Sequence, residues 1–364
     1  MNKIKAFLAR KGVVCSFRQY GVDALGAMAQ GLFCTLLVGT ILNTLGQQLH
    51  IGFLTAPVVS VGTVSYTVGG LASAMVGPGI AVAIGTALHC PPLVLFSLIP
   101  VGFAANAMGG AGGPLAVYAV TIIAAELGKL VSKETRIDIL VTPCVTVIAG
   151  IAVAQLIAAP IGTAARAVGL AIMWATELQP FFMGVLVSAL IGIALTLPIS
   201  SAAICAAFGL TGLAGGAAVA GCCAQMVGFA VMSFKENRWG GLVAQGVGTS
   251  MLQMPNILKN PRIWIPPTLA SMITGPLATC VFKLQMNGSP VSSGMGTCGF
   301  VAQIGVYTGW VSDIAAGTKA AITPMDWIGL VLICFILPAV LSTLFCRVLE
   351  KRGWIREGDM KLDL

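Results

Sequence analysis

The sequence predicts an all-α integral membrane protein with about 10 transmembrane helices, re-entrant hairpins and an inverted repeat. Between Asp23 and Glu126 there is no Asp, Glu, Lys or Arg over 102 consecutive positions. The whole chain is 57% hydrophobic and 9% charged, whereas about a quarter of the residues of a soluble domain are charged. Gly, Pro, Ser, Thr and Asn recur through the charge-free run, which predicts helices that are broken inside the membrane.

Length and charge exclude several other classes of protein. A chain of 364 residues has room for about 10 crossings of roughly 30 residues each, and not for a sizeable soluble domain as well. The excess of 20 Lys and Arg over 12 Asp and Glu lies in short flanks, so the positive-inside rule explains it and no nucleic-acid partner is predicted. Eleven cysteines without a CxxC pair and two histidines predict no metal site and no cofactor. No acid, base and nucleophile are assembled, so the protein is not predicted to be an enzyme.

Basic clusters predict which segments face the cytoplasm. They lie in the N-terminal arm, at Lys129–Arg136, Lys235–Arg238 and Lys259–Arg262, and from Arg347 onward. With these clusters inside, both termini are cytoplasmic, and the first helix is retained rather than cleaved as a signal peptide. The predicted crossings are Val22–Leu45, Phe53–Leu88, Leu93–Ala105, Pro114–Leu127, Ile139–Ala159, Phe181–Pro198, Ile199–Gly216, Ala217–Phe234, Ile263–Phe282 and Trp327–Cys346.

Three segments are predicted not to cross the membrane. Gly240–Ile257 begins and ends beside basic clusters, so both of its ends lie on one side and it forms a re-entrant hairpin. Asn287–Gln303 is too polar and too rich in glycine for a helix that faces lipid, and Ile161–Trp174, interrupted by Arg166, is expected at the membrane surface. The predicted parts are a cytoplasmic amphipathic segment 1–20, a membrane domain 21–348 with halves 21–160 and 180–348, and a cytoplasmic tail 349–364.

A short motif occurs once in each half of the chain. Leu71–Pro78 is LASAMVGP and Leu269–Pro276 is LASMITGP, and each is followed by a Pro-Val pair and then a Met-Gly pair. The topology above runs the first copy inward and the second outward, as an inverted repeat requires. Chance similarity in a chain so rich in Ala, Leu, Gly and Pro is the alternative.

Polar side chains inside the broken segments are the candidates for binding a solute. Amide and hydroxyl groups form directional hydrogen bonds to polyhydroxylated or zwitterionic ligands, and broken backbone adds donors and acceptors. The alternative is that these residues only satisfy the broken backbone and allow close helix packing. The candidates are Asn106, Gln245, Thr249, Ser250, Gln253, Asn256, Asn287, Ser292 and Ser293.

Two carboxylates near apolar segments complete the candidate binding set. Glu126 lies either in a bundle interior or in a helix-end ion pair with Lys129, three residues later. Glu177, with Gln179 in the sequence ATELQP, either binds sugar hydroxyls or a proton or is a solvated cap at the interface. Nothing in the charge-free run neutralises a full charge except helix ends, which favours a neutral or weakly charged polar solute.

Two stretches carry a resemblance to a known family. They are GTSMLQMPNILKNPRIWIPPTLASMITGP (Gly248–Pro276) and NGSPVSSGMGTCGFVAQIGV (Asn287–Val306), with KIKAFLARKGV and DALGAMAQGL near the N-terminus. The chain resembles the membrane-embedded IIC (EIIC) subunits of the bacterial sugar phosphotransferase system, in the branch that includes the membrane regulator PfoR. The resemblance covers essentially the whole chain and implies a homodimeric carrier in the bacterial cell membrane that works with a separate IIB protein.

The sequence departs from that family in two respects. No IIA or IIB region is present, so phosphotransfer needs separate partners. The Gly-Ile-x-Glu-Pro-like motif of glucose-type IIC subunits has only an imperfect and earlier analogue at Ala175–Pro180. We therefore expect a carrier that moves a small neutral polar solute such as a sugar across the lipid bilayer by alternating access. The alternative is a PfoR-like membrane sensor that binds a ligand and signals to gene regulation.

Overall fold

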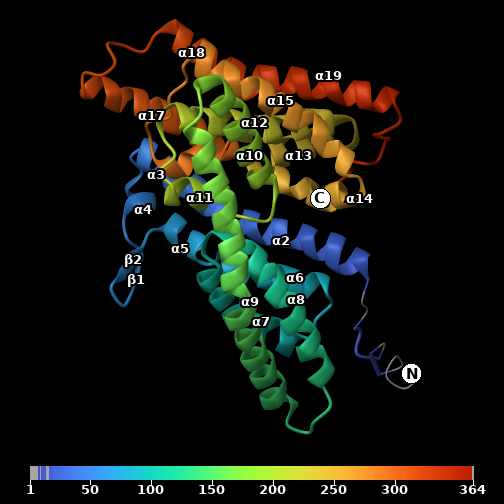
Figure 1. Cartoon of the computed structure of the whole chain (residues 1–364). Helices are drawn as coiled ribbons and strands as arrows, with labels where there is room; N and C mark the ends of the chain where they lie inside the picture. The colour runs from blue at the N-terminus through green and yellow to red at the C-terminus, as the bar shows by residue number, and fades with distance from the viewer. Residues whose placement is uncertain (1–6, 9, 14–15, 363–364) are drawn as a thin grey trace. The chain divides into compact units, whose positions relative to one another are not determined.

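The computed structural model describes residues 7–8, 10–13 and 16–362 (Figure 1). Parts of the predicted segment 1–20, including Lys3 and Lys5, lie outside these residues. The chain divides into two compact units, Met1–Ala164 and Ala165–Leu364, which we call unit 1 and unit 2. Nearly every element within them is a helix, as predicted for an all-α protein.

Unit 1 contains most of the charge-free run. Its elements are the helices η1 (Arg18–Asp23), α2 (Ala24–Leu32), η2 (Phe33–Leu37), α3 (Val38–Gln48) and α4 (Gly52–Thr55), the strands β1 (Val59–Val61) and β2 (Val64–Tyr66), and the helices α5 (Val68–Ala74), α6 (Val76–Ala87), α7 (Pro92–Gly109), η3 (Gly110–Gly112) and α8 (Gly113–Val131). Helix α9 (Asp138–Thr176) begins in unit 1 and continues past residue 164 into unit 2.

Unit 2 is a bundle interrupted by short helices. Its elements are α10 (Pro180–Thr196), α11 (Ser201–Ala207), α12 (Gly212–Met232), α13 (Phe234–Val243), η4 (Ala244–Gly248), η5 (Ser250–Gln253), α14 (Met254–Lys259), η6 (Pro261–Trp264), α15 (Ile265–Pro276), η7 (Leu277–Val281), α16 (Pro290–Ser293), η8 (Cys298–Phe300), α17 (Val301–Ala315), α18 (Pro324–Val331), η9 (Leu332–Ile336) and α19 (Leu337–Lys351).

Helix α6 is the centre of unit 1 and packs against α2, α7 and α8. Close approach depends on glycine, because the backbones meet where a side chain would otherwise stand. Gly31 of α2 lies against the backbone of Gly79 in α6, and Gly77 of α6 lies against the carbonyl of Gly102 in α7. Such small-residue contacts are the usual means by which helices associate in membranes, where burial of apolar surface gives no driving force.

Helices α7 and α8 form an antiparallel hairpin. The backbone of Gly110 has φ 54° and ψ −122°, outside the helical region, so the chain reverses there. Gly128 near the end of α8 lies against Val94 near the start of α7, as antiparallel neighbours must. Two separate helices were expected here, at Leu93–Ala105 and Pro114–Leu127, and the hairpin provides both.

Five helical stretches are long and apolar enough to cross a membrane, namely Arg18–Gln47, Pro92–Val131, Asp138–Thr176, Gly212–Met232 and Pro324–Lys351. The pair α5 and α6, bent by 53°, makes a sixth. One hydrogen bond of the helical ladder is missing at this bend because Pro78 has no N–H. Since the stretch Pro92–Val131 is the α7–α8 hairpin, it supplies two helices of 18 and 19 residues. Together these helices establish an all-α membrane protein.

The predicted crossing Phe53–Leu88 contains an unforeseen β-hairpin. Strands β1 and β2 pair antiparallel, with Val61 opposite Val64 and a turn between them that Gly62 makes with φ 60°. The sequence VSVGTVSY alternates β-branched and small polar residues, which is the period-2 pattern of a strand. Within the predicted crossing, only the bent pair α5 and α6 is a candidate membrane span.

Two other expectations about helix boundaries were wrong. A break was expected at Arg166, but α9 runs unbroken for 39 residues and the exposed Arg166 side chain points away from the buried face. A long side chain of this kind extends its charge toward polar surroundings without ending the helix. The predicted crossing Ile199–Gly216 was also wrong, because Gly209 and Gly212 have positive φ and leave only the seven-residue helix α11.

Unit 2 packs around α12, which contacts α10, α15 and α19 (Figure 1). Gly221 of α12 lies against the Ser188 carbonyl of α10, and the Ser188 hydroxyl donates to the Ser271 carbonyl of α15 at 2.7 Å. Gly275, in the second copy of the repeated motif, lies against the carbonyl of Gly184 in α10. Both motif copies thus use their Gly-Pro glycine for a backbone contact with a neighbouring helix.

The predicted re-entrant segment Gly240–Ile257 is a series of short buried helices. It runs from the end of α13 through η4 and η5 into α14, and Thr249 interrupts it with an extended backbone at φ −159° and ψ 141°. Its polar side chains Gln245, Ser250 and Gln253 are fully buried. Polar groups buried in this way must find hydrogen-bond partners inside the protein.

Candidate functional site

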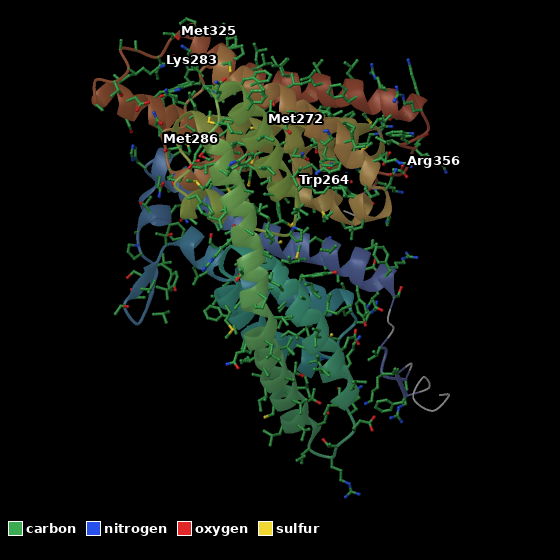
Figure 2. All side chains as sticks on the ribbon, in the orientation of Figure 1. Trp264, Met272, Lys283, Met286, Met325 and Arg356 are labelled. Carbon is green, nitrogen blue, oxygen red and sulfur yellow. The ribbon has the colours of Figure 1, made fainter. Side chains whose placement is uncertain are left out.

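A polar pocket of about 520 Å³ lies at one end of unit 2. Figure 2 places Lys283 and Met325 at this end, away from Arg356. The pocket is formed by the segment after η7, the last turn of α17 and the connection to α18. Its lining residues are Phe282, Lys283, Gln285, Asn287, Trp310, Asp313, Thr318, Lys319 and Asp326.

The first wall of the polar pocket is an extended segment that follows η7. Met286 forms an isolated antiparallel bridge with Gly212, with N···O distances of 3.1 and 3.0 Å. Because side chains alternate along extended backbone, the buried Met286 leaves its neighbours Gln285 and Asn287 on the opposite side, toward the pocket. The bridge therefore fixes the direction of both amides.

The second wall is the connection between α17 and α18. The amides of Thr318 and Lys319 donate to the carbonyl of Asp313 at 2.9 and 3.2 Å, so the chain folds back over the end of α17. Helix α18 then begins with a capping box in which Thr323 and Asp326 bind each other's backbone N–H groups. These local bonds place one carboxylate from α17 and one from α18 on the same pocket.

The two carboxylates have different partners. Asp313 Oδ2 accepts from Asn287 Nδ2 at 2.8 Å, and its Oδ1 makes no hydrogen bond within the residues that the structure describes. Asp326 Oδ1 accepts from Lys319 Nζ at 2.9 Å, and its Oδ2 accepts from the backbone and hydroxyl of Thr323 at 2.8 Å each. Asp313 is therefore the carboxylate with hydrogen-bonding capacity left for a ligand.

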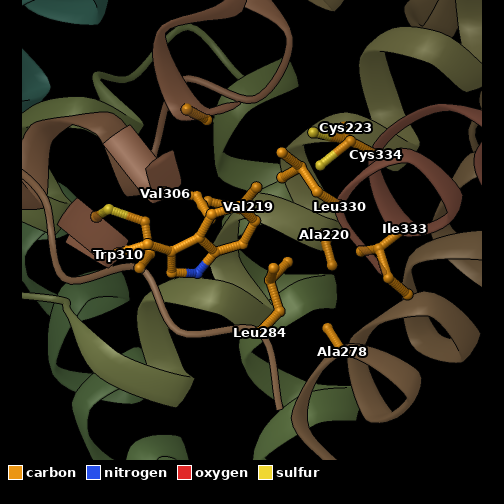
Figure 3. Close-up of a cluster of buried hydrophobic side chains, with 12 residues drawn as sticks. Val219, Ala220, Cys223, Ala278, Leu284, Val306, Trp310, Leu330, Ile333 and Cys334 are labelled. Carbon is orange, nitrogen blue, oxygen red and sulfur yellow. The ribbon is translucent and has the colours of Figure 1, made fainter. Parts of the chain in front are cut away.

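Trp310 forms the apolar part of the lining. It is 2% exposed, stands edge-on to Trp327 at 5.5 Å between ring centroids, and has Lys319 Nζ 5.8 Å from its centroid. Behind the indole lies a cluster of buried side chains that includes Val219, Leu284, Val306 and Leu330 (Figure 3). This packing fixes the position of the indole.

The chemistry of the polar pocket fits a neutral polar ligand. The charges of Lys283 and Lys319 balance those of Asp313 and Asp326. Amide, hydroxyl and carboxylate groups supply donors and acceptors, and the aromatic side chains supply an apolar face, which together suit a compact molecule with several hydroxyl groups. No group of three His, Cys, Asp or Glu side chains able to hold a metal ion occurs in the described part of the chain.

Three of the predicted amides meet elsewhere in unit 2, in a row that we call the amide chain. Gln245 Nε2 donates to Ser233 Oγ, Gln253 Nε2 donates to Gln245 Oε1, and Asn256 Nδ2 donates to Gln253 Oε1, each at 2.9 Å. Both glutamines are 0% exposed. The amide chain is thus a buried and internally bonded structure.

Residues 354–362, which we call the docked segment, complete the bonding of the amide chain. The Met360 carbonyl accepts from Gln253 Nε2 at 2.9 Å and from Asn237 Nδ2 at 2.8 Å. The Lys361 carbonyl accepts from Asn256 Nδ2 at 2.8 Å. The donor groups of these amides are therefore bound to protein rather than left for a solute.

Ser250 belongs to a second buried network. Its hydroxyl lies 2.8 Å from that of Thr196, which contacts Gln225. Gln225 Nε2 donates to Thr268 Oγ1 at 3.1 Å, and its Oε1 accepts from Trp264 Nε1 at 3.0 Å. These bonds link η5, α10, α12 and α15 across the interior of the bundle.

The other predicted residues of unit 2 are dispersed. Thr249 Oγ1 accepts from the backbone amide of Met251, and the Ser293 hydroxyl donates to the Leu210 carbonyl. Ser292 is 7% exposed. Glu177 and Gln179 are exposed in the connection between α9 and α10. Of the ten predicted residues in this unit, Asn287 alone lines the polar pocket.

Two predicted residues belong to unit 1. Asn106 is half-buried beside the α7–α8 turn, where its side chain lies against Gly113. Glu126 forms an ion pair with Lys129 at 2.8 Å, and their side chains are 14% and 2% exposed. The expected ion pair is therefore present, and it is buried.

Sequence reasoning missed Trp310, Asp313, Lys319 and Asp326. The available signal is the stretch VSDIAAGTKAAITPMDW, where charged residues return between two apolar segments, with Trp310 just before it. A return of charge next to aromatic residues is also what an ordinary loop at the membrane interface shows. The four side chains become a candidate site only when the fold brings them beside Asn287.

Comparison with known proteins identifies one family. The profile described as Phosphotransferase system, EIIC matches residues 22–362, which is nearly the whole chain. Neither the curated proteins nor the solved structures contain a significant match.

Proposed function

Because the chain belongs to the phosphotransferase-system EIIC family of membrane permease components, we propose that it binds and translocates a small neutral polar solute such as a sugar. The observation that carries the proposal is the polar pocket, whose charges cancel and whose lining combines two side-chain amides with the buried indole of Trp310. A charged solute would lose its hydration there without gaining a net counter-charge. A polyhydroxylated solute instead exchanges water for directional hydrogen bonds.

We place the polar pocket on the external side of the membrane. The proposed topology puts both termini in the cytoplasm, so α18 and α19 run inward from the pocket toward Lys351. With η9 between them they form a stretch of 28 residues, which spans about 42 Å as a helix, enough to cross a hydrocarbon core of about 30 Å. Solute then enters from outside, and alternating access of the broken helices carries it inward.

Partners complete the proposal. Phosphotransfer, if it accompanies transport, is assigned to separate IIA and IIB proteins rather than to this chain. The functional unit is proposed to be a homodimer in the bacterial cell membrane. These assignments follow the family, and the polar pocket supports the proposal that this chain recognises the solute.

The test is uptake of labelled sugars and polyols by proteoliposomes that contain the full chain, with and without a candidate IIB protein. We expect one class of solute to accumulate, and we expect Lys319→Gln to reduce its uptake while the exposed Lys351→Gln does not. Uptake equal to that of empty vesicles across the whole panel would contradict the carrier proposal. Ligand-induced thermal stabilisation without any uptake would instead favour the PfoR-like sensor.

A further inference from the structure

Unit 1 contains a second pocket, of about 400 Å³, at the end of α8. Its lining carries four basic side chains and one acidic side chain, whereas the charges of the polar pocket cancel. We call it the basic pocket. It is lined by Arg10, Lys11, Pro91, Lys129, Ser132, Lys133 and Glu134.

The basic pocket is built by the segment 10–13 lying against the last turn of α8. Lys129 Nζ donates to the carbonyls of Gly12 at 3.0 Å and Leu88 at 3.3 Å, so its hydrogen bonds are used within the protein. Lys11 Nζ donates to the Ser132 carbonyl, and its side chain is 8% exposed. Cations are favoured at this end of a helix, where the carbonyl groups lack intrahelical partners.

A carboxylate of the protein already occupies the centre of the basic pocket. Glu134 Oε1 is bound by Arg10 at 2.7 Å and by Lys11 at 2.5 Å, two cations on one oxygen. The ring of Phe7 lies 5.3 and 5.8 Å from these two cations and holds them together. The hydrogen bond from Lys11 and the charges of Arg10 and Lys11 lower the pKa of the Glu134 carboxyl.

Two further features leave room for an external anion. The Glu134 side chain is 40% exposed, so it can leave the pocket without crossing the packed interior. Lys133 has φ 60°, and its backbone N–H donates to Asp138 Oδ1 at 2.7 Å. The charge of Asp138 interacts with those of Lys11 and Lys133, but the Lys133 ammonium makes no direct hydrogen bond or ion pair with any residue that the structure describes. The basic pocket therefore holds one cation without a direct partner beside two cations that share the Glu134 carboxylate, with Asp138 as the second acidic side chain nearby.

We propose that the basic pocket binds a phosphate-type oxyanion, which displaces the Glu134 carboxylate from Arg10 and Lys11. A phosphate group carries more charge than a carboxylate and offers more acceptor oxygens, so it binds Arg10, Lys11 and Lys133 together. The same chemistry is offered by free inorganic phosphate and by the phosphomonoester headgroup of phosphatidic acid. In the proposed topology the pocket faces the cytoplasm.

The test uses the full chain and two ligand arms. One arm measures binding of inorganic phosphate to the protein in neutral detergent at constant ionic strength. The other measures binding of phosphatidic acid against phosphatidylcholine in nanodiscs. We expect Arg10→Gln to weaken binding about tenfold in the responding arm, because a charge-assisted hydrogen bond is lost. We expect Glu134→Gln to strengthen it about tenfold, because the internal competitor is lost.

Matched controls separate this site from general charge effects. Lys351→Gln removes one exposed positive charge at the end of α19 and should leave affinity unchanged. Response in the phosphate arm assigns a soluble anion, and response only to phosphatidic acid assigns a lipid headgroup. Arg10 is 65% exposed, so its variant should unfold at the same temperature as the unsubstituted protein without ligand. No response in either arm, or weakening by Glu134→Gln, would overturn the proposal.

Discussion

The amide chain and the polar pocket of unit 2 are built from similar side chains and differ in what remains unbonded. In the amide chain, Gln245, Gln253 and Asn256 bind one another and the docked segment, and all three are buried. In the polar pocket, Asp313 retains a free oxygen beside an open cavity. Polarity inside a membrane protein therefore does not by itself indicate a binding site, and unused hydrogen-bonding capacity is what distinguishes the polar pocket from the amide chain.

The largest expected effect is on stability, from Gln253→Ala. The change leaves Gln245 Oε1 without its donor, Asn256 Nδ2 with only one of its two acceptors, and the Met360 carbonyl with one donor fewer. Since each unsatisfied buried group costs about 1–3 kcal/mol, we expect unfolding to become easier by roughly 3 kcal/mol. Thermal unfolding of the full chain in detergent measures this loss.

The exposed Gln179→Ala is the matched control for that substitution and should change stability by less than about 0.5 kcal/mol. In the folded fraction of Gln253→Ala, solute affinity should stay as it was. A Gln253→Ala variant that keeps its stability but binds solute more weakly would contradict this assignment. It would indicate that the amide chain, and not the polar pocket, binds the solute.

The next effect is on affinity, from Asp313→Asn. The substituted amide still accepts from Asn287, so folding is retained, but a charge-assisted bond to the solute becomes a neutral one. We expect the solute concentration for half-maximal uptake to rise about tenfold, equivalent to about 1.4 kcal/mol. Uptake at a series of solute concentrations measures it, with the exposed Glu177→Gln as the control. An unchanged concentration dependence would remove Asp313 from the site.

A smaller effect is expected from Thr196→Val in the second buried network. Valine keeps the shape of threonine but leaves the Ser250 hydroxyl without its partner at 2.8 Å. Loss of one such bond costs about 1 kcal/mol. Chemical unfolding resolves this change, and the double variant with Ser250→Ala should recover part of it because no hydroxyl is then left alone.

The smallest effect concerns pH and the docked segment. The Glu236 carboxylate accepts from the amides of Gly358 and Met360 at 3.0 Å each. Burial under the segment raises the pKa of Glu236 despite these bonds, and the nearby charges of Asp359 and Glu357 act in the same direction. Because docking raises this pKa, the bound segment takes up protons. Docking is therefore strongest below the ordinary Glu pKa and weakens as pH rises through the raised value.

Fluorescence of Trp354, whose ring stacks on Arg262 at 5.2 Å, reports this docking. We expect its signal to change between the ordinary Glu pKa and the raised value, and to be flat above that range. Glu236→Gln should remove the change. A transition of the same size in Glu236→Gln would assign it to another titrating group.

The positions of most helices could be predicted from the sequence because they depend on local composition. The absence of charge from Ala24 to Ala125 and the Gly-Pro breaks are properties of neighbouring residues. The alternating Val59–Tyr66 hairpin was missed because a strand and a helix break are both short, apolar and rich in small residues. The helix break expected at Arg166 was wrong because a single exposed charge need not end a helix.

The candidate site was less predictable because hydrogen-bond partners are distant in sequence. Gln253 donates a hydrogen bond to the Met360 carbonyl, more than a hundred residues away in sequence. The residues adjacent to Gln253 therefore do not show that its amide N–H groups already have acceptors. Asp313 and Asp326 meet Asn287 only through the fold of the α17–α18 connection. Residue type alone could not show which polar side chains are available to a ligand, because availability depends on tertiary contacts.

The docked segment also has a consequence for the order of synthesis. A ribosome makes the chain from the N-terminus, so Gln253 and Asn256 are in place before Met360 and Lys361 exist. During that interval Gln253 and Asn256 keep their bonds to Gln245 and to each other, but one N–H of each amide lacks its carbonyl acceptor and is left to water. A chain that ends shortly before residue 360 should therefore insert into the membrane but lack the Met360 and Lys361 carbonyl acceptors. We expect cellular proteases to degrade it faster than the full chain.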